Sequence, residues 1–197
     1  MQFADLDLNG SYTYADYFKW RFEERVELIK GKIFKMSPAP NRVHQKLAGY
    51  IHVRLDNFLN GKSCEVYGAP FDVRFPQKTK SDKQIITVLQ PDVCVICDPA
   101  KLDDRGCIGA PDIVVEVLSP GNNAKELKKK YEVYEESGVK EYWIVSPQDQ
   151  WVRSYTLTEG KYQESPYLVS GDTLESSVLP GFSLNIGDLF KGIGPAE

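Results

Sequence analysis

Pro111-Asp112-Ile113-Val114-Val115-Glu116-Val117-Leu118-Ser119-Pro120 is the stretch of sequence that decides the fold. Its apolar part is short, rich in β-branched side chains and bounded by proline on both sides, which predicts a strand buried on both faces. Glu116 interrupts this run, and an unpaired carboxylate in such a place costs several kcal/mol. The carboxylate therefore needs a metal cation, a lysine or a proton beside it. A single ion pair that closes a structural gap is the plainer alternative.

Length and composition set the broad class. The chain has 197 residues, enough for a sizeable hydrophobic core, and we expect a single domain over residues 1–197. No apolar stretch is long enough to span a bilayer, and the acidic N-terminus lacks the basic and apolar parts of a signal peptide. We therefore expect a cytoplasmic protein with no membrane partner. The net charge of −4 argues against non-specific binding of nucleic acid over the whole surface, but it leaves room for a local basic site.

Two of the four cysteines have the spacing of some zinc sites. Cys94 and Cys97 form a C-x-x-C pattern, but both lie in the strand-like run 93–97. Residues three apart on a strand point to opposite faces, so these two thiols cannot share one zinc ion or bridge each other. We expect both to be small core residues.

The remaining pattern predicts alternating helices and strands. Apolar residues recur at helical spacing over 43–59, after the candidate cap Asn41. A second helix is expected over 124–137, ended by Gly138, and a short one over 16–24. The expected strands are a hairpin of 26–29 with 33–36, then 65–75, 85–96, 112–118, 139–145 and 151–156, and the tail near 180–190 is expected to pack on an edge. This order indicates an α/β fold with a mixed central sheet flanked by helices.

Carboxylates on two of these strands form a candidate metal site. Asp92 opens one strand and Glu116 lies near the end of a later one. Adjacent strands would bring both side chains to one side of the sheet. Two carboxylates with a backbone carbonyl make a hard-oxygen site suited to magnesium, although an aspartate before a strand can also simply bond to a loop amide.

One lysine on the following helix is turned toward the sheet. The apolar stripe of helix 124–137 consists of Leu127, Tyr131 and Tyr134, and Lys130 lies closer to that stripe than Lys125, Lys128 and Lys129 do. A solvated helix face explains Lys125 and Lys129 well and Lys130 poorly. Glu126, one turn earlier, is positioned to orient Lys130.

Several of these segments together resemble the Uma-two family of restriction endonucleases. They are Pro91-Asp92-Val93, residues 111–120, Lys130 with Tyr134, and Gly138-Val139-Lys140-Glu141-Tyr142-Trp143-Ile144-Val145. The N-terminal stretch Val26-Glu27-Leu28-Ile29-Lys30-Gly31, with Met36-Ser37-Pro38 and His44-Gln45, fits the same pattern. The resemblance covers roughly residues 12 to 190.

That family is part of the PD-(D/E)XK nuclease superfamily, so the resemblance implies a restriction-endonuclease-like core, magnesium dependence and hydrolysis of phosphodiester bonds in DNA. Carried over by position, Asp92 and Glu116 are the metal-binding carboxylates. The superfamily usually places its lysine two residues after the second acid, which is Leu118 here, and the family's own position on the following helix matches Lys130. Glu27 matches a recurrent acidic position that reaches the metal directly or through water. Glu126 departs from the family, which more often has aspartate there.

These observations together predict a metal-dependent DNA endonuclease. Asp92 and Glu116 hold magnesium, for which manganese can substitute, Lys130 polarises or deprotonates the attacking water, and Glu27 completes the metal shell or the layer around it. One alternative is a non-catalytic module that keeps the fold to bind nucleic acid or protein, and another is a metal hydrolase of small phosphoesters. We expect DNA as partner and favour a homodimer, in which two sites cut both strands.

Two further groups of residues keep two interpretations each. His44 fits either a hydrogen-bonded structural histidine or a group near the scissile phosphate. Lys78, Lys80 and Lys83 fit either ordinary solvated residues or a clamp on the DNA backbone.

Overall fold

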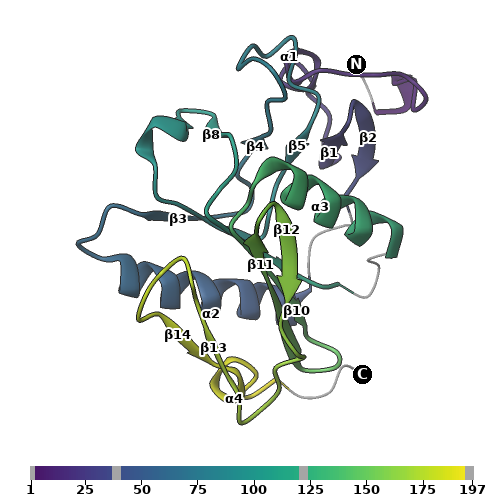
Figure 1. Ribbon diagram of the computed structural model, residues 1–197. Helices are drawn as coiled ribbons and strands as arrows, with labels where there is room; N and C mark the ends of the chain where they lie inside the picture. The colour runs from purple at the N-terminus through teal and green to yellow at the C-terminus, as the bar shows by residue number, and fades with distance from the viewer. Residues whose placement is uncertain (1–2, 37–40, 120–123, 194–197) are drawn as a thin grey trace.

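The computed structural model describes residues 3–36, 41–119 and 124–193. Two six-stranded sheets make up most of it, and a two-stranded sheet lies near the C-terminus. We call the two large ones the central sheet and the N-terminal sheet. Figure 1 shows the N-terminal sheet above the central sheet, with α2 (Arg42–Leu59) and α3 (Ala124–Ser137) packed against the latter and α1 (Tyr14–Tyr17) at the top of the molecule. That all of this is a single domain stays an expectation.

The central sheet is mixed, as the sequence predicts. Its strand order is β12-β11-β10-β9-β6-β3, in which β9 and β10 run parallel and all other neighbours run antiparallel. Its strands are β3 (Glu65–Gly68), β6 (Val93–Ile96), β9 (Ile113–Val117), β10 (Glu141–Ser146), β11 (Trp151–Thr158) and β12 (Lys161–Glu164). Helix α3 (Ala124–Ser137) provides the crossover between the parallel strands.

The N-terminal sheet was not anticipated as a separate layer. Its order is β2-β1-β5-β4-β8-β7. Its strands are β1 (Val26–Ile29), β2 (Lys32–Lys35), β4 (Val73–Arg74), β5 (Val88–Leu89), β7 (Leu102–Asp103) and β8 (Gly106–Ile108). The expected strands 65–75 and 85–96 each break in two, with Pro70 and Pro91 at the breaks. A proline cannot donate a ladder hydrogen bond, so the chain leaves one sheet there and joins the other.

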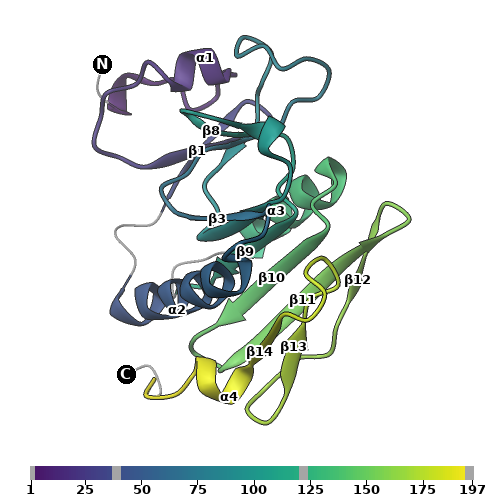
Figure 2. The same ribbon diagram turned by 90° about the vertical axis from the view of Figure 1, so that its left-hand side faces the viewer.

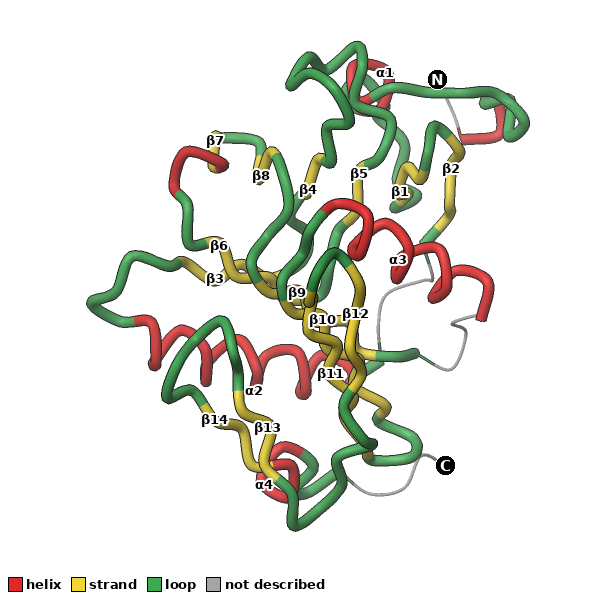
Figure 3. Tube along the Cα trace, viewed as in Figure 1, coloured by secondary structure: helices red, strands yellow, loops and turns green. Residues whose placement is uncertain are grey.

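Helices cover both faces of the central sheet, as predicted. Helix α2 (Arg42–Leu59) packs on one face with the C-terminal segments β13 (Thr173–Glu175), β14 (Ser183–Asn185) and α4 (Ile186–Leu189), while α3 and the N-terminal sheet cover the other (Figures 1 and 2). The tail therefore lies under α2 and not on a sheet edge. The short helical pieces η1 (Phe3–Asp5), α1 (Tyr14–Tyr17) and η2 (Pro99–Lys101) lie in the connections (Figure 3).

Strand β9 shows how the sequence sets this layering. Successive side chains of a strand point to opposite faces. Ile113, Val115 and Val117 accordingly join the apolar cluster around α2, whereas Val114 joins the cluster that contains Val133 and Tyr134 of α3. Glu116 has the same parity as Val114, so it faces α3.

The helix predictions hold for the two long helices and fail for the first. The Asn41 side chain caps α2 by accepting from the His44 N–H at 2.9 Å. The helix expected over 16–24 is only the four-residue α1. Nη1 of Arg21 donates to the Phe18 and Trp20 carbonyls, and these are acceptors that a longer helix would have used itself.

The cysteine prediction is right for Cys94 and wrong for Cys97. Cys94 is a buried free thiol, as is Cys107, and it makes no bridge with Cys97. Cys97 instead forms a disulfide with Cys64. The β3–β6 register pairs Glu65 with Ile96, which brings the two residues that flank this pair together. Among the described residues, no helix combines the length and the apolar character that crossing a membrane requires.

Candidate active site

Asp92 and Glu116 lie across from each other on neighbouring strands. The β6–β9 register pairs Cys94 with Val114 and Val93 with Val115, so one further step sets Asp92 opposite Glu116. The Asp92 carboxylate also bridges to the next residue of β9, because its Oδ2 accepts from the Val117 N–H at 2.8 Å. The two predicted carboxylates are thus brought together at the end of the central sheet.

Lys130 lies between two glutamates from different layers. Its Nζ is 3.1 Å from Glu116 Oε1 and 3.1 Å from Glu27 Oε1. All three side chains are buried. Glu27 comes from β1 of the N-terminal sheet, Glu116 from β9 of the central sheet and Lys130 from α3. The Lys130 ammonium therefore links the three layers. As the sequence predicts, Lys130 is turned toward the sheet.

Further hydrogen bonds fix the two glutamates. The Tyr134 hydroxyl donates to Glu116 Oε1 at 2.6 Å, and the Gln90 N–H donates to Glu27 Oε1 at 2.8 Å. Tyr134 was placed in the apolar stripe of its helix by the sequence, which gave its hydroxyl no role. Its spacing of four residues from Lys130 puts both on one helix face, and this spacing is the signal that could have identified it.

Burial and neighbouring negative charges raise the pKa of Glu116. Desolvation raises the pKa of Glu116 to about 7, with Asp92 and Glu27 also raising it, while Lys130 and the Tyr134 hydroxyl lower it. Burial alone would lower the pKa of Lys130, but Glu116 and Glu27 reverse this effect and raise it above its ordinary value. Lys130 is accordingly an ammonium near neutral pH, and Glu116 is poised to gain or lose a proton there.

His44 is the hydrogen-bond partner of Asp92 in the site. Its Nε2 lies 3.1 Å from Asp92 Oδ2, and the side chain is buried. Burial lowers the pKa of His44, but the hydrogen bond and charge of Asp92 outweigh it and raise the pKa overall. Of the two interpretations left open by the sequence, His44 is thus hydrogen-bonded, and its partner is a predicted metal-binding carboxylate.

The other predicted residues lie away from this centre. Asp112, which like Asp92 follows a proline at the start of a strand, is structural, because its carboxylate accepts from the Cys97 N–H and pairs with Lys140 Nζ, at 2.8 and 2.7 Å. Lys128 is exposed. Lys129 does not point freely to solvent as expected, since its Nζ lies over the Phe34 ring, 4.2 Å from the centroid.

Some expectations concern other parts of the chain. Lys78, Lys80 and Lys83 are exposed in their loop. The Lys125 side chain and the loops 37–40 and 120–123 lie outside the described residues.

The donor set suits a hard cation, although the cluster is not preformed. Asp92, Glu116 and Glu27 supply carboxylate oxygens, the ligands that magnesium takes. Glu27 Oε2 is buried without a hydrogen-bond partner, so it has free acceptor capacity. Within the part of the chain that the structure describes, however, no three or more His, Cys, Asp or Glu side chains are grouped so as to hold a metal ion. The Lys130 ammonium lies between two of the candidate ligands.

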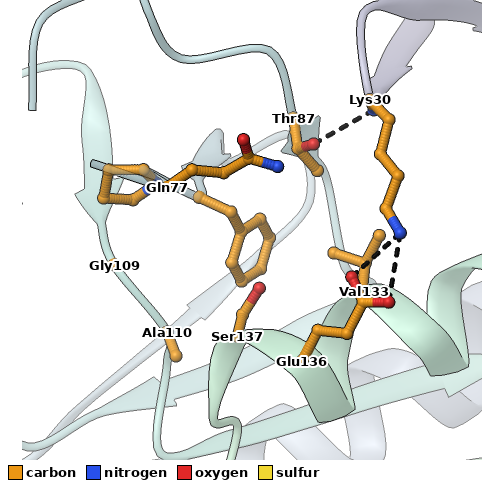
Figure 4. Close-up of a pocket in the computed structure, with 10 residues that line it drawn as sticks. Lys30, Gln77, Thr87, Gly109, Ala110, Val133, Glu136 and Ser137 are labelled. Atoms are coloured by element: carbon orange, nitrogen blue, oxygen red, sulfur yellow. Dashed lines mark hydrogen bonds and ion pairs between the residues drawn. The ribbon is translucent and has the colours of Figure 1, made fainter. Parts of the chain in front are cut away.

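A cavity of about 330 Å³ opens at the other end of β1 and α3. Figure 4 shows Lys30 paired with Glu136 at its side and Gln77 reaching toward Thr87. The ring of Phe75 lines this cavity and packs on Tyr134, with centroids 6.0 Å apart. The four predicted catalytic residues do not line it.

Comparison with known proteins agrees with this geometry. A solved structure from Anabaena variabilis ATCC 29413, described as a "putative nuclease belonging to DUF820", superposes with a TM-score of 0.71 over 91% of this chain and 97% of its own, at 20% identity. "Uncharacterized protein slr1290" of Synechocystis sp. (strain ATCC 27184 / PCC 6803 / Kazusa) is 26% identical over 182 residues, 90% of each chain. The fold is therefore nuclease-like. The model of the Uma2 family, described as "Putative restriction endonuclease", matches residues 14–187, and the chain belongs to that family.

Proposed function

We propose that this protein is a metal-dependent endonuclease that hydrolyses phosphodiester bonds of DNA. Asp92 and Glu116 would hold a magnesium ion, or manganese in its place, and Glu27 would complete the shell directly or through water. The family and the nuclease-like fold support a nuclease role. The metal and the DNA substrate are our inference from the residues of the site.

One observation carries the proposal: a buried lysine shared by two buried glutamates, beside a third carboxylate. Stability alone does not explain such a group, because a buried ion pair seldom stabilises a fold more than apolar residues of the same shape would. Three carboxylates face Lys130 and His44, so the site has acceptor capacity for a further cation. Strongly perturbed acids and bases that share one site are typical of active sites.

The residues can divide the chemistry among them. A bound magnesium ion lowers the pKa of its water and neutralises charge on the phosphate. Lys130, held as an ammonium by Glu27 and Glu116, donates hydrogen bonds to the attacking water or to the charged phosphoryl oxygens. The raised pKa of Lys130 favours this polarising role over proton abstraction. His44 holds the Asp92 carboxylate in place through its Nε2.

A specific observation also favours the non-catalytic alternative. Lys130 already pairs with Glu27 and Glu116, so two candidate ligands have a cation without metal. A protein that kept the fold and this ion pair could bind nucleic acid without cutting it. The two functions differ in whether added metal produces cleavage.

The test is incubation of purified protein with supercoiled plasmid and with linear DNA, in magnesium, manganese or EDTA. We expect cleavage with either metal and none with EDTA. Glu116→Gln should cut neither DNA, whereas the matched variant Glu141→Gln, which changes a buried glutamate on the neighbouring strand, should cut both. Salt-dependent DNA binding without cleavage in any metal would establish the binding module instead.

The same assay addresses assembly. Two sites in a homodimer would produce linear plasmid directly, while a single site would first accumulate nicked circles. Light scattering of the protein alone gives the oligomeric state independently. A monomer that releases nicked product would remove the homodimer from the proposal and leave the chemistry intact.

A further inference from the structure

We propose that a second cavity, on the outer face of the N-terminal sheet, binds an unpaired nucleobase of the strand whose phosphate reaches Asp92 and Glu116. The inference rests on the proposed function, because it assigns part of the substrate to this cavity. It adds a base-binding site to a reaction centre that otherwise contacts only the backbone. It also predicts a preference for single-stranded or locally opened DNA.

The cavity has the size and lining of a small-molecule site. Its volume is about 400 Å³, within the range of ligand pockets. Four aromatic side chains line it: Tyr17, Phe18, Trp20 and Phe22. Trp20 stacks on Phe22 with centroids 5.6 Å apart and planes inclined by 29°. Phe18 is 46% exposed, although the Arg105 guanidinium lies over its ring, 5.2 Å from the centroid.

Gln90 links this cavity to the reaction centre. Its side chain lines the cavity, while its backbone N–H donates to Glu27 Oε1 at 2.8 Å. Gln90 is two residues before Asp92, a separation of about 7 Å in extended chain. A short stretch of chain therefore joins the cavity to Asp92, and in our proposal the phosphate lies at Asp92 and the neighbouring base in the cavity.

The polar groups of the cavity are held in fixed positions. The Gln90 amide donates to Asp72 Oδ1 at 2.9 Å and to the Tyr17 hydroxyl at 3.2 Å. Its oxygen accepts from Arg25 Nη2 at 2.8 Å. The donors of the Gln90 amide are thus used within the protein, and the exposed Arg25 guanidinium at the edge of the aromatic surface is the polar group that suits the rim of a nucleobase.

The charges of the rim favour a base over a free phosphate or an acidic ligand. Arg21 and Arg25 are offset by Glu23 and Glu24 in the same lining. A strongly anionic ligand would be repelled by the two glutamates, whereas a neutral base is not. Stacking requires an open ring face, and bases within an intact duplex have none. The occupant is therefore a base that has left its pair.

The test measures binding in EDTA, so that it does not depend on cleavage. The probe is a fluorescein-labelled single strand of about twelve nucleotides, with a set of versions that carry one abasic position at each site in turn. We expect at least one abasic position to weaken binding about ten-fold, which corresponds to the loss of one stacked base. An intact duplex of the same sequence should show no such position-specific loss.

Variants decide whether the base lies in this cavity. Trp20→Ala and Phe18→Ala should lower affinity for the intact strand and abolish the abasic penalty. Phe18→Ala changes a half-exposed side chain, so it remains informative if Trp20→Ala fails to fold. Tyr167→Ala is the matched control, because Tyr167 is an exposed aromatic residue, 55% accessible, that does not line the cavity. It should keep the penalty.

Each outcome has a defined meaning. An abasic penalty that survives in both cavity variants, or no penalty in the wild type, would overturn the base-binding site. A position-specific penalty that both variants abolish supports it, even if the protein never cuts DNA. Cleavage of duplex DNA at full rate by Phe18→Ala, with no abasic penalty in the wild type, would remove this inference and leave the proposed function standing.

Discussion

Glu116 and Glu141 are two buried glutamates on neighbouring parallel strands, and their surroundings could hardly differ more. Glu141 opens β10 and accepts hydrogen bonds from neutral donors in the C-terminal segment and from the indole of Trp143. Glu116 is near the end of β9 and faces Lys130, the Tyr134 hydroxyl and two further carboxylates. The same residue type thus fastens a segment in one place and builds a charged centre in the other.

The difference teaches how to distinguish a structural carboxylate from a reactive one. The Glu141 carboxylate accepts hydrogen bonds from Ser176, Ser177 and Val178, which form a single short stretch of chain. Little of its acceptor capacity remains for another ligand. The hydrogen-bond partners of Glu116 come from helix α3, and one of them, Lys130, carries a charge, while the carboxylate of Glu27 beside it keeps an unsatisfied oxygen. Burial is common to both glutamates. The kind of partner separates them.

The largest expected effect comes from Glu116→Gln. The swap keeps the size of the side chain but removes one negative charge from the proposed metal shell, so we expect DNA cleavage to fall on the order of a thousand-fold or more. Folding and DNA binding should remain near wild type, because Lys130 still pairs with Glu27. The measurement is the initial rate of plasmid cleavage in magnesium, with circular dichroism as the folding control. Cleavage at the wild-type rate would make Glu116 as structural as Glu141.

Removal of the lysine should affect stability as well as activity. Lys130→Met leaves Glu27 and Glu116 buried without their cation, and we expect the free energy of unfolding to fall by about 3–5 kcal/mol. Lys129→Met is the matched control on the next residue; it loses only a contact with the Phe34 ring, worth about 1 kcal/mol or less. Urea unfolding of the two variants in EDTA gives both values. Equal losses would mean that Lys130 contributes no more than an ordinary surface lysine.

The sequence predicts these elements unevenly, and the residues show why. Local signals suffice for α2, whose Leu47, Ile51 and Leu55 recur at helical spacing, and for β9, whose boundaries are prolines. The Lys130 prediction also rests on local helical geometry. The role of Glu27 was predicted only from the family resemblance. Its strand, β1, belongs to a second sheet, and the contact between Glu27 and Lys130 of α3 joins residues about a hundred positions apart.

Pairings between distant strands account for what was missed. The Cys64–Cys97 disulfide depends on the register of β3 with β6, and hydrophobic pattern does not specify which strands become neighbours. The prolines at 70 and 91 did mark the breaks between the two sheets, but a proline alone does not say where the chain goes next. The Gln90 link between Glu27 and the aromatic cavity likewise exists only once both sheets are placed.

The raised pKa of Glu116 predicts that the stability of the fold depends on pH. Its pKa rises from 4.5 to about 7 on folding, so the folded protein binds more protons than the unfolded chain between these values. The contribution to stability is therefore present below about pH 4.5 and is lost as the pH rises through about 7, by on the order of 3 kcal/mol at most. Urea unfolding in EDTA at pH 5 and pH 8 measures it. The difference between wild type and Glu116→Gln isolates this residue, and a difference that is constant with pH would contradict the raised pKa.

The smallest effect is expected from Glu141→Gln, and it acts on stability alone. The amide keeps one oxygen for the Ser176 hydroxyl and the Trp143 indole but turns an NH₂ toward the backbone donors at Ser177 and Val178, so about 1–3 kcal/mol of the free energy of unfolding should be lost. The C-terminal segment packs on α2, on the face of the central sheet away from Lys130, so plasmid cleavage per folded molecule should match wild type. Hydrogen exchange should show the loss first in residues 173–185, because the hydrogen bonds of Glu141 anchor that segment. A variant that loses cleavage while remaining folded would mean that the two glutamates are coupled through β9 and β10, and the contrast between a fastening carboxylate and a reactive one would no longer hold.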